Sequence, residues 1–346
     1  MRFHGGNERA KIDFSVNLNP IGPPPRAYEI ATNCLKGGVL ERYPDYNYRN
    51  LKRAISEFYK FDGASLVPTA GGGEAINLAI FAFKPRRIAI VEPSYGEYED
   101  LARALGIEYS PIFYRRDSKG FYLELSDLES TCKREDALIV ITNPNNPLGL
   151  YVDRRRIYES LSRCEAKVMV DEAYRELCNR CYIEIDRDLP ENFIVVRSIS
   201  KWLSLPGLRI GFLYARDGEL VEKIEAIRQP WNIGGLSECI VSSLLSMERE
   251  MRDFIEESRM YIAREREKLE RGLRSLGIKT YESAVNFILA ESPYMKNIVF
   301  ELEREGIAVR KCTSFKGLGE EYVRIGIRKS WENEKLLESL ERAMKH

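Results

Sequence analysis

The sequence predicts an α/β protein in which a mainly parallel sheet is flanked by helices, with a smaller α+β domain beside it. Between residues 65 and 215, short apolar runs alternate with helical patterns, as parallel strands joined by crossover helices do. The 346 residues exceed the usual length of one domain, and a hydrophobic share of 44% supplies a sizeable core. We therefore expect a large domain over 35–235 and a small domain over 1–34 and 236–346.

The first residues form a leader rich in glycine, asparagine and proline, with little periodicity before the apolar stretch 12–16. Such a leader gains order only by lying against another part of the chain. His4 is either a solvated residue or a ligand contact, and the glycines beside it allow the backbone to approach a ligand closely. A Tyr-Pro turn then precedes a helix with apolar residues at Leu51, Ile55 and Phe58.

The large sheet is predicted from five apolar runs with helical patterns between them. These runs are 87–91, 137–142, 167–171, 193–196 and 209–215. Ligands of such sheets bind at the carboxyl ends of the strands. Three loops are expected there.

Each of these loops carries groups that suit a small ligand. The glycine cluster at 71–73 opens a helix, so it is either a tight turn or a phosphate site at a helix N-terminus. Paired Asn-Pro steps at 143–147 direct amide side chains toward the strand ends. Asp171 ends a buried strand, where a carboxylate needs a cationic or proton-sharing partner. A protonated pyridine nitrogen is such a partner.

The stretch 197–212 is the centre of the predicted site. Lys201 follows Ser198 and Ser200 at the point where we expect a strand to give way to a loop, and Arg209 precedes the next strand. A lysine amine can form a Schiff base with an aldehyde, while hydroxyls and a guanidinium suit a phosphate dianion. The stretch therefore indicates pyridoxal phosphate, against the alternative of a solvated lysine in an ordinary surface loop.

Beyond residue 231 the pattern changes to long amphipathic helices over 238–273 and then to an α+β unit. Its expected strands are 279–283, 286–291, 307–312 and 322–327, and its expected helices are 296–306 and 332–344. Arg310 and Arg324 fall on neighbouring strands, where they are either ion-paired or ligand-binding.

Charge and cysteine content limit the partners and the cellular location that we expect for the protein. The 53 basic and 53 acidic side chains cancel, which gives no support for a nucleic-acid partner. No apolar run approaches the ~20 residues that span a bilayer, so we expect a soluble protein with no membrane partner. Seven scattered cysteines predict reduced thiols in the cytoplasm. Cys178 and Cys181 have the spacing of half a zinc site, but no second pair of ligands follows, so we predict no metal.

With its Asn-Pro loop, Asp-Glu-Ala-Tyr motif and Lys201 segment in that order, nearly the whole chain resembles fold-type I pyridoxal-phosphate enzymes, in the branch with histidinol-phosphate aminotransferase. The resemblance implies a Schiff-base role for Lys201, a pyridine-nitrogen partner in Asp171, and neighbours of the ring hydroxyl in Asn146 and Tyr174. It also implies that Tyr95 stacks on the ring and that Tyr43 reaches the phosphate from the other subunit of a homodimer. The remaining implied cofactor contacts are Gly72, Gly73, Glu74, Ser198, Ser200 and Arg209.

The leader, with its His-Gly-Gly-Asn start and the stretch 13–24, is similar to that of the L-threonine-O-3-phosphate decarboxylases of cobalamin biosynthesis. This similarity implies a phosphorylated amino acid as substrate and 1-aminopropan-2-ol phosphate as product. The segment between the two leader motifs is shorter here. The implied substrate contacts are His4, Gly5, Asn17, Asn146, Arg310 and Arg324. The alternatives are an aminotransferase of the histidinol-phosphate type and a non-catalytic ligand-sensing protein, the latter disfavoured by the presence of Lys201, Asp171 and Arg209 together.

Overall fold

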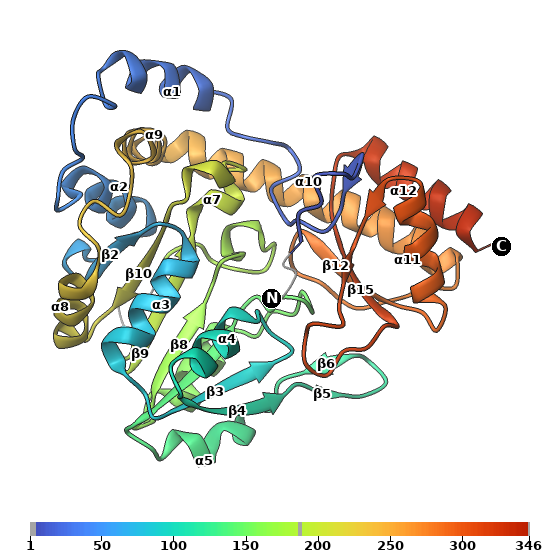
Figure 1. Ribbon diagram of the computed structural model, residues 1–346, viewed down its shortest axis with the longest axis horizontal. Coiled ribbons are helices and arrows are strands. Elements are labelled where there is room, and N and C mark those ends of the chain that lie inside the picture. The colour runs from blue at the N-terminus through green and yellow to red at the C-terminus, as the bar shows by residue number, and fades with distance from the viewer. Residues whose placement is uncertain (1–4, 186–188, 345–346) are drawn as a thin grey trace.

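The computed structural model describes residues 5–185 and 189–344, which form two lobes (Figure 1). The large lobe is built on a seven-stranded sheet and the small lobe on a four-stranded sheet. The long helix α10 (Glu248–Ser275) runs from one lobe to the other. No helix in these two ranges is long and apolar enough to cross a membrane.

The large sheet has the strand order β2-β10-β9-β8-β7-β3-β4. Of its strands only β10 runs antiparallel to its neighbours, so the predicted mainly parallel sheet is confirmed. The strand bounds are β2 Leu66–Thr69, β3 Arg87–Glu92, β4 Glu108–Phe113, β7 Ala137–Thr142, β8 Lys167–Asp171, β9 Phe193–Ser198 and β10 Gly211–Ala215.

Apolar side chains on both faces of this sheet explain its near-continuous hydrophobic runs. In β7, Leu138 and Val140 join the core cluster beneath α3, α4 and α8, whereas Ile139 and Ile141 join the cluster that includes α2, α6 and α9. The bounds of these helices are α2 Arg49–Tyr59, α3 Gly72–Phe83, α4 Glu97–Ala104, α6 Arg154–Leu161, α8 Gly218–Ile227 and α9 Gly235–Ser246.

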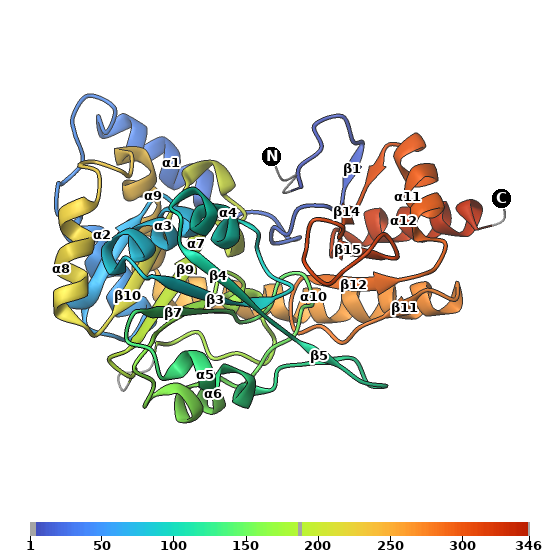
Figure 2. The same cartoon turned by 60° about the horizontal axis from the view of Figure 1, so that its bottom comes forward.

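Shorter elements complete the large lobe. Helix α1 (Ala27–Lys36) packs on α9, and α5 (Glu129–Cys132) lies before β7. Strands β5 (Arg115–Arg116) and β6 (Phe121–Tyr122) form a hairpin that extends toward the small lobe (Figure 2). The single helical turns are η1 Gly63–Ser65, η2 Leu125–Leu128, η3 Arg175–Leu177 and η4 Pro206–Leu208.

The small lobe has the antiparallel order β11-β12-β15-β14. Arg310 lies directly opposite Arg324 in its register, which confirms that these arginines occupy neighbouring strands. The leader joins this lobe, because Ile12 of β1 pairs in parallel with Ile307 of β13. The bounds are β1 Ile12–Asp13, β11 Lys279–Thr280, β12 Phe287–Glu291, β13 Ile307–Ala308, β14 Arg310–Lys311, β15 Tyr322–Gly326, α11 Met295–Arg304 and α12 Ser330–Ala343. Helix α9 packs on α1 and α2. The predicted boundaries of the two domains remain a prediction.

The cysteines correct one expectation. We predicted reduced thiols, but the structure pairs Cys34 with Cys239, Cys132 with Cys164, and Cys178 with Cys181. Their Cα atoms lie 6.1, 4.6 and 5.4 Å apart, within the range that a disulfide spans. The first pair is separated by 205 residues in sequence, so only the packing of α1 on α9 brings it together. Cys312 is unpaired and buried.

Candidate active site

A cavity of about 290 Å³ lies where the strands of the large sheet end and the small lobe begins. Its walls come from the leader, the start of α3, the ends of β7, β8 and β9, and the small-lobe strands. The structure thus gathers most of the predicted site around one space. The predicted residues that line it are Asn17, Gly72, Gly73, Tyr95, Asn146, Asp171, Tyr174, Ser198, Ser200, Lys201, Arg209, Arg310 and Arg324.

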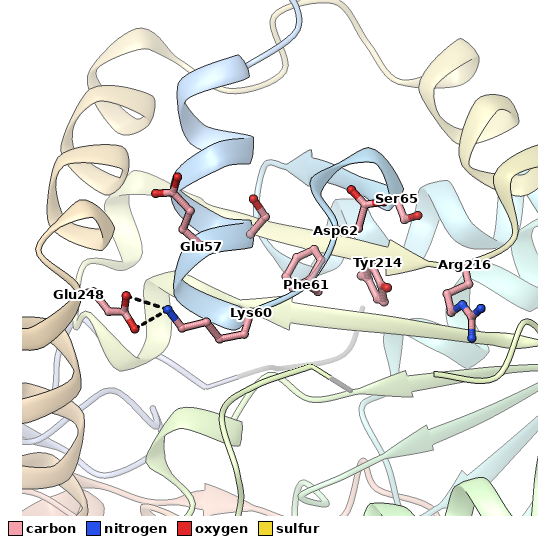
Figure 3. Close-up of a pocket in the computed structure, with 9 residues that line it drawn as sticks. Glu57, Lys60, Phe61, Asp62, Ser65, Tyr214, Arg216 and Glu248 are labelled. Atoms are coloured by element: carbon pink, nitrogen blue, oxygen red, sulfur yellow. Dashed lines mark hydrogen bonds and ion pairs between the residues drawn. The ribbon is translucent and has the colours of Figure 1, made fainter. Parts of the chain in front are cut away.

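A larger hollow, of about 840 Å³, lies elsewhere on the large lobe (Figure 3). Its wall is of mixed charge, and Lys60 within it is paired with Glu248 at 2.8 Å. Of the described residues that line this hollow, none belongs to the predicted site. Size alone therefore does not identify the reaction site, whereas the convergence of titratable and anion-binding groups does.

Asp171 ends β8 with its carboxylate buried, the residue being 5% exposed. Tyr98 of α4 donates to Oδ2 at 2.5 Å and the Ala173 amide donates to Oδ1 at 2.9 Å. Burial raises the pKa of Asp171, while the Tyr98 hydrogen bond and the charge of Lys201 oppose that rise. The cavity therefore holds an acid that favours a cationic, proton-sharing ligand.

Lys201 lies three residues beyond the end of β9, in a helical turn where we predicted a loop. Strand β9 ends at Ser198, and Lys201 belongs to the short helix α7 (Ile199–Trp202). Its Nζ lies 5.1 Å from the ring centroid of Tyr174, and its carbonyl accepts from the Asn19 amide of the leader at 3.3 Å. The amine is thus held at the carboxyl edge of the sheet, beside the acid at the end of β8.

The turn before α3 is shaped for an anion. Gly71 has φ +85°, and a Cβ there would lie 2.8 Å from Nη2 of Arg209, so only glycine fits this close approach. Gly72 and Gly73 form the first turn of the 12-residue helix α3 and line the cavity. Amide groups of a helix N-terminus together with a guanidinium are a common phosphate site.

Two of the predicted cofactor contacts, Ser200 and Glu74, use their side chains in hydrogen bonds within the protein. Ser200 lines the cavity, but its hydroxyl donates to the Ile210 carbonyl at 3.1 Å and accepts from the Ile210 amide at 2.8 Å. Glu74 is absent from the lining, and its carboxylate accepts from the Ala70 amide at 2.5 Å and from Asn232 at 2.6 Å. Both side chains therefore stabilise the turn. Ser198, which also lines the cavity, remains the predicted hydroxyl contact of the phosphate.

The small lobe contributes two arginines. Arg324 is 4% exposed and donates to the Ser15 carbonyl at 2.6 Å and to Asn146 Oδ1. With its amide oxygen turned toward Arg324, Asn17 accepts from Nη1 at 3.1 Å and from Nε at 3.2 Å. These acceptors are neutral, and burial lowers the pKa of Arg324. An anion in the cavity would offset that cost.

Arg310 faces the same region from β14. Its Nη2 donates to Ser314 Oγ at 2.8 Å, and its guanidinium lies 5.0 Å from the ring centroid of Phe315. Burial and the positive charge of Arg324 lower its pKa to about 10. Like charges directly opposite on adjacent strands are unfavourable, so an anion held between the two guanidinium groups would relieve their repulsion.

Besides Glu74, two described residues of the predicted site, Tyr43 and Gly5, are absent from the lining. Tyr43 is 77% exposed and stacks on Trp231 with ring centroids 4.5 Å apart. Gly5 lies against the leader turn, where the neighbouring Gly6 amide donates to Ser15 Oγ at 2.8 Å. His4 lies outside the described residues.

Sequence reasoning missed Tyr98, Ser15, Thr142, Ser314 and Phe315. All except Tyr98 line the cavity, and Tyr98 bonds Asp171 from behind. A signal existed for Tyr98, since a buried tyrosine hydroxyl needs a partner and the residue lies three positions after Tyr95. The serines carried no such signal: their side chains bond near neighbours such as Arg310 and Asp13, and only the fold brings them to the cavity.

Comparisons with known proteins agree on a family. The family model of aminotransferases of class I and II matches residues 9–340. A histidinol-phosphate aminotransferase of Archaeoglobus fulgidus is 30% identical, over 96% of this chain and 93% of its own. A threonine-phosphate decarboxylase of Salmonella typhimurium is 28% identical, over 97% and 95%. The solved histidinol-phosphate aminotransferase of Sinorhizobium meliloti, in complex with pyridoxal 5'-phosphate, shares the fold with a TM-score of 0.80 at 20% identity, over 95% and 89%.

Proposed function

The chain belongs to the class I and II aminotransferase family of pyridoxal-phosphate-dependent enzymes, and we propose that it decarboxylates L-threonine O-3-phosphate to 1-aminopropan-2-ol phosphate in cobalamin biosynthesis. The observation that carries the proposal is the opposed pair Arg310 and Arg324, which offers two cationic groups to a substrate with a carboxylate and a phosphate. The leader reaches Arg324 through Ser15 and Asn17. The Salmonella relative named for this activity supports the same reading.

The residues of the cavity fit pyridoxal phosphate. Asp171 is a buried acid with a raised pKa, which suits the ring nitrogen. The crowded turn at Gly71 brings Arg209 to the start of α3, which suits the phosphate. Lys201 provides the amine for the aldehyde carbon, and Tyr95 provides an aromatic face. Asn146 and Tyr174 suit the ring hydroxyl.

When bound, the cofactor supplies a ring that accepts electrons from a bond broken at the amino acid's α-carbon. Asp171 holds a proton at the ring nitrogen, because its buried carboxylate is stabilised by a cation. Lys201 takes or returns a proton near the α-carbon as a general base or acid. Arg310 and Arg324 anchor the substrate's anionic groups and so select which bond at that carbon is broken.

The alternative activity is transamination of histidinol phosphate or a similar amino acid, which the Archaeoglobus relative favours. One assay separates the two activities: the purified, cofactor-loaded protein is incubated with O-phospho-L-threonine, with and without 2-oxoglutarate. Carbon dioxide released without the oxo acid supports decarboxylation. Turnover that strictly requires the oxo acid excludes decarboxylation and establishes the alternative.

We also propose a homodimer in which Tyr43 completes the partner's cavity. Tyr43, Leu40 and Trp231 are 77%, 73% and 43% exposed, although large apolar side chains normally avoid water. Mixing subunits carrying Tyr43→Ala with subunits carrying Lys201→Ala should restore activity to about a quarter of wild type, because half of the random pairs hold one intact site. Mixtures as inactive as their components, or a monomer by light scattering, would refute the proposal.

A further inference from the structure

The loop 312–321, which joins β14 to β15, reaches from the small lobe to the large lobe. Nζ of Lys316 lies 2.8 Å from Glu99 Oε1 of α4 and 3.9 Å from the ring centroid of Tyr109. The Glu99 side chain is 0% exposed and also accepts from Arg103 at 2.5 Å. A buried carboxylate depends strongly on its cationic partners, so the contact ties this loop to a fixed point of the large lobe.

The residues next to Lys316 belong to the cavity. Ser314 and Phe315 line it, and they also hold Arg310, through the 2.8 Å hydrogen bond and the ring contact at 5.0 Å. On the other side of the contact, Tyr98 precedes Glu99 in α4 and donates to Asp171. One helix therefore contacts both the acid at the end of β8 and the loop that sets the position of Arg310.

We propose that Lys316 is a positioning residue. Its ion pair with Glu99 holds the loop 312–321 against α4, so that Ser314 and Phe315 direct the Arg310 guanidinium into the anion-binding part of the cavity. The inference rests on the proposed use of this cavity as the reaction site. It assigns a role in substrate binding to a residue outside the cavity.

The test uses three variants of the cofactor-loaded protein. Lys316→Met keeps the length of the side chain and removes its charge, and Lys316→Arg keeps the charge. Lys311→Met is the matched control, because Lys311 is likewise an ion-paired lysine, but it ends β14, pairs with Glu303 at 2.8 Å and has a side chain that is 54% exposed. The dissociation constants of inorganic phosphate and O-phospho-L-threonine are measured by calorimetry on this protein, and that of pyridoxal phosphate is measured on the cofactor-free protein.

In Lys316→Met we expect both anions to bind roughly tenfold more weakly, as for the loss of one well-placed charged contact, with cofactor affinity unchanged. Lys316→Arg and Lys311→Met should bind like wild type. Amide hydrogen exchange over 312–321 should accelerate in Lys316→Met alone, because the loop loses its anchor.

Unchanged anion binding in Lys316→Met, or equal losses in the Lys311→Met control, overturns the proposal. If wild type binds phosphothreonine without releasing carbon dioxide, the decarboxylase assignment fails. The ratio of the dissociation constants of Lys316→Met and wild type still tests the role of Lys316. If wild type binds neither anion, the exchange measurement decides, and an unaccelerated loop refutes the positioning role.

Discussion

Asp171 and Glu172 are sequence neighbours that are both buried, but their pKa values are shifted in opposite directions. Burial raises the pKa of Asp171, and its hydrogen bond to Tyr98 and the charge of Lys201 only oppose that rise. Burial also opposes ionisation of Glu172, but Arg175 and Arg197 lie within hydrogen-bonding distance and lower its pKa. The negative charge of Glu172 is therefore balanced by arginines within the fold, whereas Asp171 remains suited to a cationic ligand. The environment, and not the residue type, decides which carboxylate takes part in chemistry.

Replacement of Lys201 by alanine tests the assignment of the amine. We expect turnover to fall by about a thousandfold or more, because the variant loses both its nucleophile and its general base. The absorption spectrum of the bound cofactor should change at the same time. Lys311→Met, which leaves Lys201 and the cavity in place, is the control for both measurements. Activity close to wild type in Lys201→Ala would rule out the amine as the reactive group.

Arg324→Ala tests recognition of the substrate's anionic groups. The variant leaves Asn146, Asn17 and the Ser15 carbonyl without their donor. We therefore expect kcat/KM with phosphothreonine to fall by an amount equivalent to about 2–5 kcal/mol of lost transition-state stabilisation. The comparison with plain threonine is decisive. Wild type should strongly prefer the phosphorylated amino acid, and the variant should lose part of that preference. An unaltered preference would contradict phosphate recognition by this arginine.

At the scale of elements, ion pairs fix the relative positions of small-lobe segments, which the hydrophobic pattern alone does not specify. Glu305, at the end of α11, accepts from Arg342 of α12 at 2.6 Å and from Ser339 at 2.6 Å. These hydrogen bonds hold the pKa of Glu305 at about 2, below its ordinary value of 4.5. The contact fixes the two helices that cover the small sheet relative to each other.

We expect Glu305→Gln to lower the free energy of unfolding at pH 7 by up to about 1 kcal/mol, since the pair is partly exposed. A lowered carboxylate pKa adds stability above its unfolded value, so the difference from wild type should shrink as the pH falls from 4.5 toward 2. Urea denaturation at pH 7, 5 and 3 measures it. Glu334→Gln, on the helix of Arg342 and hydrogen-bonded to Ser330, is the control. A difference that does not depend on pH would refute the ion-pair explanation.

At the scale of the whole molecule, the disulfides change how the chain is held together. Cys34 and Cys239 join α1 to α9 across 205 residues of sequence, and closing so long a loop restricts the unfolded chain by about 2–5 kcal/mol. We had inferred a cytoplasmic location from unpaired thiols, and the three pairs remove that argument. Disulfides inside cells occur in some hyperthermophilic organisms.

The thiol count is directly measurable. Alkylation of the unfolded protein without reductant should label Cys312 alone, and after reduction it should label all seven cysteines. Mass spectrometry distinguishes the two results. Seven labelled thiols without reductant would show that the pairs do not form and would reinstate the original expectation. A Cys239→Ser variant should melt at lower temperature under oxidising conditions and match wild type under reducing ones.

The sequence by itself determined the alternation of strands and helices, the glycine turn before α3, and the placement of Asp171 and Lys201 at strand ends. These features follow from local rules, because the carboxyl ends of parallel strands share one edge of a sheet. The same rules predicted that Arg310 and Arg324 lie on neighbouring strands. They did not place Lys201 in a helical turn, since a helix of only four residues leaves little periodicity in the sequence.

Only the tertiary structure decided the pairings between distant segments. Tyr98 with Asp171, Lys316 with Glu99, and Cys34 with Cys239 are separated by 73, 217 and 205 residues. It also turned Glu74 and Ser200 into braces for the phosphate turn. Each of these contacts depends on the angle at which two packed elements meet, and that angle is set by the shapes of many buried side chains together. No short stretch of sequence contains that information, so it becomes visible only when the whole core has formed.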